Sequence, residues 1–378
     1  MKELRKKIER EIEKRGPMPF SRYMELCLYD EEFGYYARNA SQFGKAGDFY
    51  TSSDVHAVFG RLMARQFEEM WRVSGSPARI VVRELGPGRG LFARDVLDWS
   101  EKKFPEFFRA LTYELVERSG PLRERLEQNL RPHLESGRAV IREPEIPRPA
   151  SAAPTDEEIP TIVFANEFFD AIPVEVVSAR GSLRIGCRDG GFVETWAKTS
   201  EEEFEFLDRY SVHPEEDERV EVPLLAQTYL RDALAGIGRG FAVVIDYGFA
   251  REEQLAGRHR GTLKAIRQHS VSADPYEAPG DQDITADVNF TALAAVASEL
   301  GWHCEKLTTQ SQFLLGVGEA NQFADAFEQC RLPQERAKVA LQLKHLVTPA
   351  GMGESFHVLV CGKGVETSKL SGLGFGRK

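Results

Sequence analysis

A glycine-rich turn between a strand and a helix is the feature that most constrains this chain. The stretch VVRELGPGRG, residues 81–90, opens with an apolar run that is typical of a buried strand and closes at Leu85. Gly86, Gly88 and Gly90 follow at alternate positions, and apolar residues then recur at helical spacing. Glycines let the backbone approach a ligand at a helix N-terminus without obstruction from a Cβ atom. The stretch therefore predicts a strand–turn–helix unit of the nucleotide-binding α/β kind.

Glu84, just before the turn, narrows the choice of ligand. The spacing G-x-G-x-G differs from the G-x-G-x-x-G of dinucleotide folds, and a carboxylate here would repel a pyrophosphate. It would suit a ligand with cationic groups, such as the ammonium and sulfonium of S-adenosyl-L-methionine (SAM). The pattern E-x-G-x-G-x-G is similar to the first motif of Rossmann-like SAM-dependent methyltransferases. A glycine-rich turn without a ligand is the alternative.

Composition limits the class of protein. Of 378 residues, 42% are hydrophobic and 29% are charged, as in soluble globular proteins. A net charge of -10 argues against a nucleic-acid surface, because phosphate binding needs a concentrated positive field. Five scattered cysteines without a C-x-x-C predict reduced thiols in the cytoplasm, with no zinc or disulfide framework. We expect no metal and no membrane insertion, since no apolar run is long enough to span a bilayer.

The N-terminal part is expected to be helical and to lead into a lid. MKELRKKIEREIEKRG has an apolar stripe, no h-region of a signal peptide, and glutamates that argue against a mitochondrial transit peptide. The polar stretch SQFGKAGDFYTSSD, residues 41–54, is a candidate ligand loop in which Thr51 and Ser52 would cover the ligand. An ordinary surface loop is the alternative.

Strand-like runs recur along the chain and indicate the fold class. We expect five helix-linked strands near residues 80, 113, 140, 163 and 243, and a final pair near 303 and 358. Five parallel strands and a terminal hairpin-like pair make up the seven-stranded, Rossmann-like methyltransferase core. The predicted fold is therefore α/β, with an N-terminal helical and lid extension and an inserted β-rich lobe.

The predicted domain boundaries follow from these patterns. They are an N-terminal helical and lid segment (1–72), the first part of the core (73–173), an inserted substrate-side lobe of hairpins (174–239), the second part of the core (240–365) and a loose tail (366–378). Within these parts, residues 201–219 are expected to be irregular, 250–289 to form a long loop, and 319–329 to form a helix.

Polar residues follow several predicted strands at their carboxyl ends, where open α/β sheets bind ligands. Glu117 follows LTYELV, and its carboxylate would accept hydrogen bonds from ribose hydroxyls, unless it only initiates a helix. Asp246 and Tyr247 end the strand near 243 and would line an acceptor channel or satisfy backbone donors. His269, in the predicted long loop, would accept a proton after transfer or be solvated.

With these residues in hand, the chain resembles the MidA-like SAM-dependent methyltransferases, the family of the mitochondrial complex I assembly-factor protein arginine methyltransferase. It departs from the family pattern at TSSD (51–54), where the family usually has Thr-Ser-Pro-Glu, and at VNF (288–290), where it usually has Val-Asp-Phe. The matching stretches run in family order over roughly residues 17–318: PMPFSRYMELCLYDEEFGYY, GDFYTSSD, ELGPGRG, YELVERSGPLRERL, VFANEFFDAIPVE, VVIDYGF, GTLKAIRQHS, and DITADVNFTALA with TTQSQFLLGVG.

The resemblance implies a SAM site and an acceptor of the protein-arginine type. Asn166-Glu167-Phe168-Phe169 resembles the Asn/Asp-x-x-Phe/Tyr signature of methyltransferases that act on amino nitrogens. In that pattern Asn166 accepts a hydrogen bond from the attacking nitrogen, and Phe169 walls the cation. Glu167 and Asp170 would then hold the guanidinium. Alternatively, Asp170 caps a helix and Glu167 is a surface acid.

Three functions stay open on the sequence. The first is a protein arginine N-methyltransferase that uses SAM, modifies a protein linked to respiratory complex I or its assembly, and is a candidate homodimer. The second is a non-catalytic SAM-binding assembly or scaffold protein. The third is an NAD-linked Rossmann oxidoreductase, which Glu84 and the alternate-glycine spacing oppose.

Overall fold

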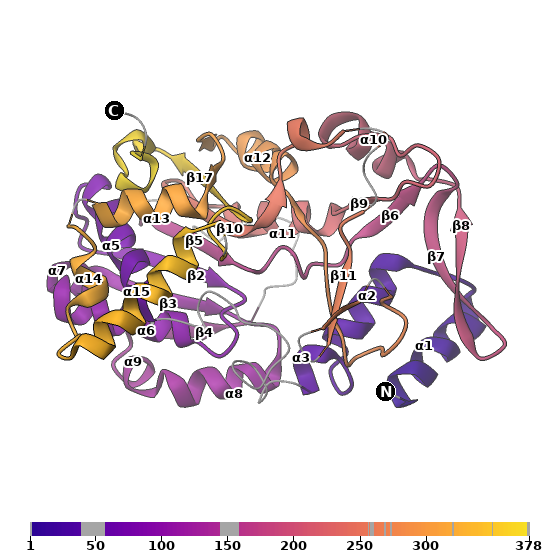
Figure 1. Ribbon diagram of the computed structural model, residues 1–378, viewed down its shortest axis with the longest axis horizontal. Helices are drawn as coiled ribbons and strands as arrows, with labels where there is room; N and C mark the ends of the chain where they lie inside the picture. Colours follow the sequence, from indigo (N-terminus) through magenta and orange to yellow (C-terminus); the bar gives the residue numbers. More distant parts are fainter. Residues whose placement is uncertain are drawn as a thin grey trace. The chain divides into compact units, whose positions relative to one another are not determined.

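The computed structural model describes residues 2–38, 57–143, 159–255, 257, 261–267, 270–272, 274–319, 321–349 and 351–375. They form two compact units, each described here by itself. Unit 1 combines the described parts of 1–49, 168–231 and 248–296. Unit 2 combines those of 50–167, 232–247 and 297–378, so the chain leaves and re-enters both units (Figure 1).

Unit 2 is built on a large mixed sheet, which confirms the predicted α/β fold. The order across the sheet is β15-β17-β10-β5-β2-β3-β4. The neighbours from β10 to β4 pair in parallel, whereas β17 is antiparallel to both β10 and β15. The strands are β2 (Ile80–Leu85), β3 (Leu111–Val116), β4 (Ala139–Arg142), β5 (Thr161–Asn166), β10 (Gly240–Phe249), β15 (His303–Cys304) and β17 (Phe356–Lys363).

The sheet is larger than the seven strands predicted. Two short strands bring the described strands to nine. β16 (Thr308–Thr309) pairs with β17, and β14 (Val288–Asn289) pairs with Gly248 and Phe249 of β10, which are grouped with unit 1 as β14 is. Both are only two residues long, which is too short for an alternating pattern to appear in the sequence. In β5, five consecutive residues (161–165) are buried. Because successive side chains of a strand point to opposite faces, both faces of the sheet are covered there.

Helices of unit 2 bury aromatic side chains against this sheet. The apolar face of α5 (Ala57–Val73) is buried in the core, where Phe67 contacts the ring of Phe164 edge-on at 5.4 Å. Phe92 of α6 (Leu91–Lys103) stacks on Phe164 at 4.8 Å. The other helices are α7 (Pro105–Ala110), α8 (Gly120–Asn129), α9 (Arg131–Glu135), α13 (Gln310–Glu319), α14 (Ala324–Phe327) and α15 (Pro333–Val347).

The helix predicted over 319–329 is wrong. The structure has α13 ending at Glu319 and only the four-residue α14 beyond it. Gln322 and Phe323 between them adopt positive φ angles of 54° and 56°, which a right-handed helix cannot continue through. None of the described helices is both long enough and apolar enough to cross a membrane.

Unit 1 contains the predicted hairpins. An antiparallel sheet runs β1-β7-β6-β9, with β8 paired to β7. The apolar stripe of α1 (Lys2–Arg15) packs in the same core as β7, where Leu4 and Ile8 are completely buried. The other elements are α2 (Phe20–Tyr29), α3 (Tyr35–Arg38), α11 (Leu224–Leu234), α12 (Phe290–Glu299), β1 (Met18–Pro19), β6 (Glu175–Ser178), β7 (Gly181–Arg188), β8 (Gly191–Ala197) and β9 (Val220–Val222).

The prediction that residues 201–219 are irregular is wrong for their first half, because α10 spans Glu201–Tyr210. A capping box starts this helix. The backbone N–H of Glu203 donates to Ser200 Oγ at 3.2 Å, and the backbone N–H of Ser200 donates to Glu203 Oε2 at 2.6 Å. The S-x-x-E spacing of residues 200–203 is the sequence signal for such a cap, although the surrounding acidic composition suggests irregular structure.

Residues 250–289 form more than the predicted long loop. The described part contains η1 (Arg251–Glu253) and a three-stranded antiparallel sheet of order β12-β11-β13. These strands, β11 (Lys264–Arg267), β12 (Ser270–Ser272) and β13 (Asp283–Thr285), have at most four residues each. Ile284 of β13 packs into the core of unit 1, so 248–296 group with unit 1 and not with the second part of the core. The described part of the tail is not loose, contrary to the prediction, because η3 (Ser371–Leu373) packs into the core of unit 2 and the N–H of Gly372 donates to Gln66 Oε1 at 3.1 Å. The other domain boundaries stay predictions.

The expectation that all five cysteines are reduced is wrong for one pair. Cys304 in β15 lies directly opposite Cys361 in β17, with 4.0 Å between their Cα atoms, and the two form a disulfide. The strand register creates this pair, and the two residues are 57 positions apart, so spacing in the sequence does not reveal it. Cys27, Cys187 and Cys330 are free thiols.

Candidate functional site

The carboxyl edge of the unit 2 sheet carries most of the predicted site residues. The chain passes from β2 to β3 and β4 on one side and returns to β5 on the other. Such a reversal of strand order is where open α/β sheets bind ligands. Leu85 pairs with Val116 and with Ala165, and Ile245 pairs with Asn166. The segments that follow these residues therefore leave the sheet at one edge.

The glycine turn has the left-handed backbone that its sequence predicts. Gly86, Gly88 and Gly90 have φ angles of 62°, 55° and 73°. The N–H of Gly86 donates to the carbonyl of Val116 at 3.0 Å, and that of Gly90 to the carbonyl of Pro87 at 2.9 Å. A Cβ atom at Gly88 would meet nothing within 4 Å. Gly88 therefore presents bare backbone to open space at the start of α6.

Gly90 has a different role, because it packs against α8. A Cβ atom there would lie 2.6 Å from Leu126 Cδ2 and 2.9 Å from Leu130 Cδ1. Asn129, between these two leucines, donates from Nδ2 to the carbonyl of Arg89 at 2.9 Å. The turn is thus braced from α8 by contacts that the sequence analysis missed. Nothing in the local sequence marks Asn129 as a partner of a turn 40 positions earlier.

We expect Gly90→Ala to lower the free energy of unfolding by about 2–4 kcal/mol, since it combines left-handed strain with overpacking. Urea unfolding followed by circular dichroism would measure this loss. Gly137→Ala is the matched control, because Gly137 also has a positive φ, 71°, but open space around its Cβ position. That variant should lose only about 1 kcal/mol. Equal losses would mean that the contact with α8 is unimportant.

Glu84 is a buried acid at the end of β2. Its side chain accepts a hydrogen bond from the Tyr113 hydroxyl at 2.9 Å, and the residue is 5% exposed. Burial raises the pKa of Glu84 to about 8. Among the described residues, Glu84 forms no ion pair with a basic side chain. An acid held in this way suits a cationic group that arrives with a ligand.

Tyr113 was missed by the sequence analysis. It lies opposite Val82 in the β2–β3 pair, and Val82 shares a face of β2 with Glu84 because alternate residues of a strand point the same way. The tyrosine hydroxyl can therefore reach across to the carboxylate. The tyrosine stands within the predicted strand LTYELV, but only the register of the strands shows which residue it contacts.

Glu117 leaves β3 next to the glycine turn. The residue is 7% exposed, and its Oε1 accepts a hydrogen bond from the backbone N–H of Ser119 at 2.8 Å. Burial raises the pKa of Glu117 to about 7, although backbone N–H groups of Ser119 and Gly88 act in the opposite direction. A carboxylate at this position stands beside the turn, as the ribose-binding prediction requires.

Asn166 is the last residue of β5, and Glu167 directly after it has an unusual backbone conformation. Glu167 has a φ of 50°, and its N–H donates to the carbonyl of Ile245 at 3.0 Å. Asn166 Nδ2 donates to Glu167 Oε1 at 3.1 Å. Asn166 Oδ1 is buried and accepts no hydrogen bond from any described residue. Strained backbone and an unsatisfied buried acceptor are both features that collect at functional sites.

Asp246 and Tyr247 are too deeply buried to line an open channel. Asp246 is completely buried, and its Oδ1 accepts from the backbone N–H of Tyr247 at 3.0 Å. Tyr247 is 9% exposed, and its ring contacts Phe356 edge-on at 5.4 Å. These contacts favour the alternative in which Asp246 satisfies a backbone donor and Tyr247 belongs to the core.

Two of the remaining predicted residues lie in the other unit, which is described by itself. Phe169 and Asp170 belong to unit 1, where the carbonyl of Asp170 accepts from the backbone N–H of Ala286 at 2.9 Å. Both are nearly buried, with 3% and 6% of their surfaces exposed. Thr51, Ser52 and His269 lie outside the described residues.

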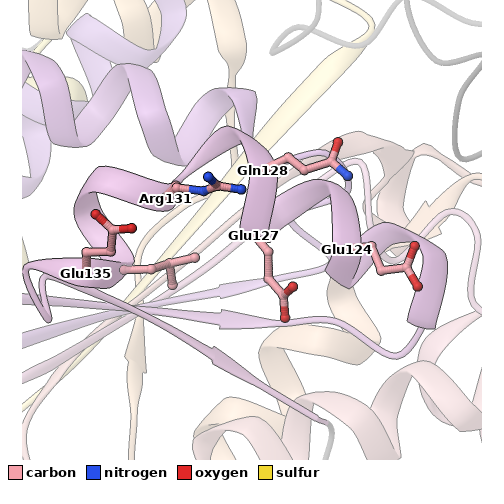
Figure 2. A pocket seen from close by; sticks show the side chains of 6 residues that line it. Glu124, Glu127, Gln128, Arg131 and Glu135 are labelled. Carbon is pink, nitrogen blue, oxygen red and sulfur yellow. The ribbon is translucent and has the colours of Figure 1, made fainter.

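A surface pocket of about 440 Å³ lies on α8 and α9, and it contains none of the predicted site residues (Figure 2). Three glutamates and one arginine dominate its lining, and no aromatic ring contributes to it. Its chemistry matches neither the glycine turn nor the Asn166 segment. The lining residues are Glu124, Glu127, Gln128, Arg131, Leu134 and Glu135.

Comparison with known proteins identifies the family. A family model described as an S-adenosyl-L-methionine-dependent methyltransferase matches residues 62–308, well over half of the chain. The chain belongs to this methyltransferase family. The predicted recognition, enzyme class and SAM cofactor are thereby confirmed.

Relatives and solved structures agree with this family. The protein arginine methyltransferase NDUFAF7 homolog of Drosophila melanogaster is 30% identical, with 97% of this chain and 86% of the relative covered. The protein arginine methyltransferase NDUFAF7 of Homo sapiens is 26% identical, with 92% and 80% covered. A crystal structure from Burkholderia thailandensis, bound to S-adenosyl-homocysteine, superposes on the methyltransferase with a TM-score of 0.82, 29% identity, and 98% and 94% coverage.

The predicted cytoplasmic location is wrong in the light of these relatives. The NDUFAF7 proteins of Drosophila melanogaster, Danio rerio and Homo sapiens are all named mitochondrial. The prediction relied on scattered cysteines and on the composition of the first helix. Neither the spacing of the cysteines nor the composition of one helix identifies a compartment, and Cys304 and Cys361 in fact form a disulfide.

Proposed function

We propose that this methyltransferase transfers the methyl group of SAM to an arginine side chain of a protein linked to respiratory complex I or its assembly. The observation that carries the proposal is the unsatisfied, buried Oδ1 of Asn166 at the carboxyl end of β5, next to the strained Glu167. The names of the relatives, protein arginine methyltransferase, support the choice of acceptor.

The glycine turn and its two acids fit the methyl donor. Glu84 would pair with the ammonium group, since it is a buried acid without a basic partner among the described residues. Glu117 would accept hydrogen bonds from the ribose hydroxyls, and the open backbone of Gly88 would lie against the ligand. Gly86 and Gly90 shape the turn, and Thr51 and Ser52 would cover the ligand. When bound, SAM supplies an electrophilic methyl group on a sulfonium.

The Asn166 segment would hold and aim the acceptor nitrogen. Asn166 Oδ1 accepts a hydrogen bond from that nitrogen and so orients its lone pair toward the methyl group. Glu167 and Asp170 pair with the guanidinium and stabilise the positive charge that the added methyl group brings. The ring of Phe169 would pack against the cation. The methylated guanidinium would then lose its proton to water or to His269. Asp246 and Tyr247 support this edge from β10.

Isothermal titration calorimetry tests the donor half of the proposal. We expect saturable SAM binding, no detectable NAD binding, and a roughly tenfold loss of SAM affinity in Glu117→Ala, because a buried acceptor of ribose hydrogen bonds is removed. Absence of SAM binding, or preferential NAD binding, would remove the basis for the proposal. Mass spectrometry of methylated arginine in partner proteins would then test the acceptor half.

A further inference from the structure

Tyr113 supplies the one hydrogen bond that Glu84 accepts from the described part of the chain. The tyrosine lies in β3 and is completely buried in the core of unit 2. Its hydroxyl donates to Glu84 Oε2 at 2.9 Å, whereas Oε1 accepts no hydrogen bond from a described residue. Both residues belong to unit 2, so the contact depends only on the strand register within one compact unit.

The other side chains beside this carboxylate in the sheet are apolar. Leu115 of β3 and Phe164 of β5 are the register partners of Glu84, and both are completely buried. Partners in register point to the same face of a sheet, so these two side chains flank the acid. Tyr113 stands two positions before Leu115 and therefore points to that face as well. Of these three neighbours, only Tyr113 can donate a hydrogen bond to the carboxylate.

Tyr113 is a donor that leaves the charge of Glu84 in place. A lysine or arginine at this position would pair with the acid and compete with the ammonium group of a ligand. Burial, followed by the charge of Glu84, raises the pKa of Tyr113 well above its ordinary value. The hydroxyl therefore keeps its proton and continues to donate. The result is an oriented carboxylate whose second oxygen no described residue occupies.

The hydrogen bond also acts on the ionisation of Glu84. Burial raises the pKa of Glu84, the hydrogen bond from Tyr113 lowers it, and the charge of Glu117 raises it, with a net value of about 8. Tyr113 and Glu117 are the titratable groups among the described residues that act on this carboxylate. Tyr113 is thus the neighbour that favours the ionised acid, which is the form that a cationic ligand needs.

We propose that Tyr113 is a positioning residue for the methyl donor. Its hydroxyl holds Glu84 Oε2 and leaves Oε1 to accept the ammonium group of SAM. The inference rests on the proposed function for the pairing of Glu84 with that ammonium. It adds a residue that acts on the donor only through Glu84, and it assigns the β2–β3 register a role in donor binding.

Carbon-13 NMR of the ligand-free full chain tests the hydrogen bond by itself. The side-chain carboxyl carbons of glutamate are labelled, and the resonance of Glu84 is the one lost in Glu84→Gln. We expect Tyr113→Phe, which keeps the buried ring, to raise the titration midpoint of this resonance by about one pH unit or more, because a hydrogen bond to the ionised form is lost. An unchanged midpoint would overturn the inference.

Tyr276→Phe is the matched control. The hydroxyl of Tyr276 also donates to a glutamate at 2.9 Å, namely to Glu194 Oε1, but this pair belongs to unit 1. Its loss should leave the midpoint of Glu84 in place. A similar shift in both variants would mean that the effect comes from general loosening of the fold, and it would contradict a specific role of Tyr113.

Donor affinity as a function of pH shows whether this shift reaches the ligand. The probe is S-adenosyl-homocysteine, which carries the same ammonium as SAM, measured by calorimetry. The unmodified chain should bind it about tenfold more tightly than Tyr113→Phe at pH 7 but only about twofold more tightly at pH 9, because high pH ionises Glu84 in both chains. Comparing the two chains at each pH cancels the titration of the ligand. A loss that is equal at every pH would show a structural role and overturn the inference.

The double variant tests whether Tyr113 acts through Glu84. In the Glu84→Gln background, Tyr113→Phe should change affinity by no more than about twofold, because the carboxylate on which the hydroxyl acts is gone. A further tenfold loss in that background would mean that Tyr113 affects the donor by another route, which contradicts the inference.

The same measurements distinguish this inference from the proposed function. Failure of the proposed function would appear as absent binding of both SAM and S-adenosyl-homocysteine by the unmodified chain, with the NMR shift in Tyr113→Phe intact. Failure of the inference would appear as intact binding that weakens in Glu84→Gln, with the pH profile of Tyr113→Phe identical to that of the unmodified chain.

Discussion

We expect Glu167→Gln to slow methyl transfer about 100-fold or more while SAM affinity stays within about threefold. Glutamine has nearly the shape of glutamate and still offers an oxygen to Asn166 Nδ2, which donates to Glu167 Oε1 at 3.1 Å. The substitution therefore removes the negative charge and little else. A loss of this size corresponds to about 2.7 kcal/mol of transition-state stabilisation, as expected for one charged partner of a guanidinium.

The measurement is the transfer of labelled methyl groups from SAM into protein extracts of cells that lack this chain, with SAM affinity determined by calorimetry. Asp170→Asn should show the same separation of transfer from binding. Glu101→Gln, an exposed acid of α6, is the control and should leave both quantities unchanged. If transfer and SAM affinity fall together, the two acids are structural. If transfer survives, they take no part in the reaction.

Glu84→Gln is expected to have the second large effect, with opposite consequences for binding and stability. SAM affinity should fall about 100-fold, because the substitution neutralises the buried carboxylate that we propose as the partner of the ammonium group. The ligand-free variant should be more stable than the unmodified chain by about 1–3 kcal/mol near pH 8, because it no longer buries an ionising acid.

The pH dependence follows from the direction of the pKa shift. In the folded chain the pKa of Glu84 is raised to about 8 from its ordinary 4.5, so burial favours the protonated acid. The stability that this group contributes is fully present below its unfolded pKa and is lost as the pH rises through about 8. The stability advantage of Glu84→Gln should therefore grow between about pH 5 and pH 8. Urea unfolding at several pH values measures it.

Ligand binding should change with pH in the opposite sense. SAM affinity of the unmodified chain should rise up to about tenfold per pH unit below pH 8, because only the ionised carboxylate pairs with the ammonium, and should level off above it. Glu117, with a pKa of about 7, adds to the slope at lower pH. In Glu84→Gln the rise between about pH 7 and pH 8.5 should disappear. An unchanged slope in this variant would show that Glu84 does not meet the ammonium.

Local features of the chain determined the predictions that hold. The glycines at 86, 88 and 90 predict a left-handed turn, because only glycine adopts positive φ angles without strain. In the structure all three have positive φ angles. The apolar run of β5 predicts a strand that is buried on both faces. The family resemblance rests on motifs of this kind, each contained within about twenty consecutive residues. Such features depend on neighbours along the chain and survive in a linear sequence.

Only the tertiary structure decided which distant residues meet. Tyr113 reaches Glu84 across 29 positions, Asn129 reaches Arg89 across 40, and Tyr36 reaches Asp283 across 247. Each contact depends on strand register or on how a helix packs, and a shift of one residue would turn the side chain to the other face. The sequence by itself therefore determined the fold class and the donor motif. The burial that raises the pKa of Glu84 exists only once the chain has folded.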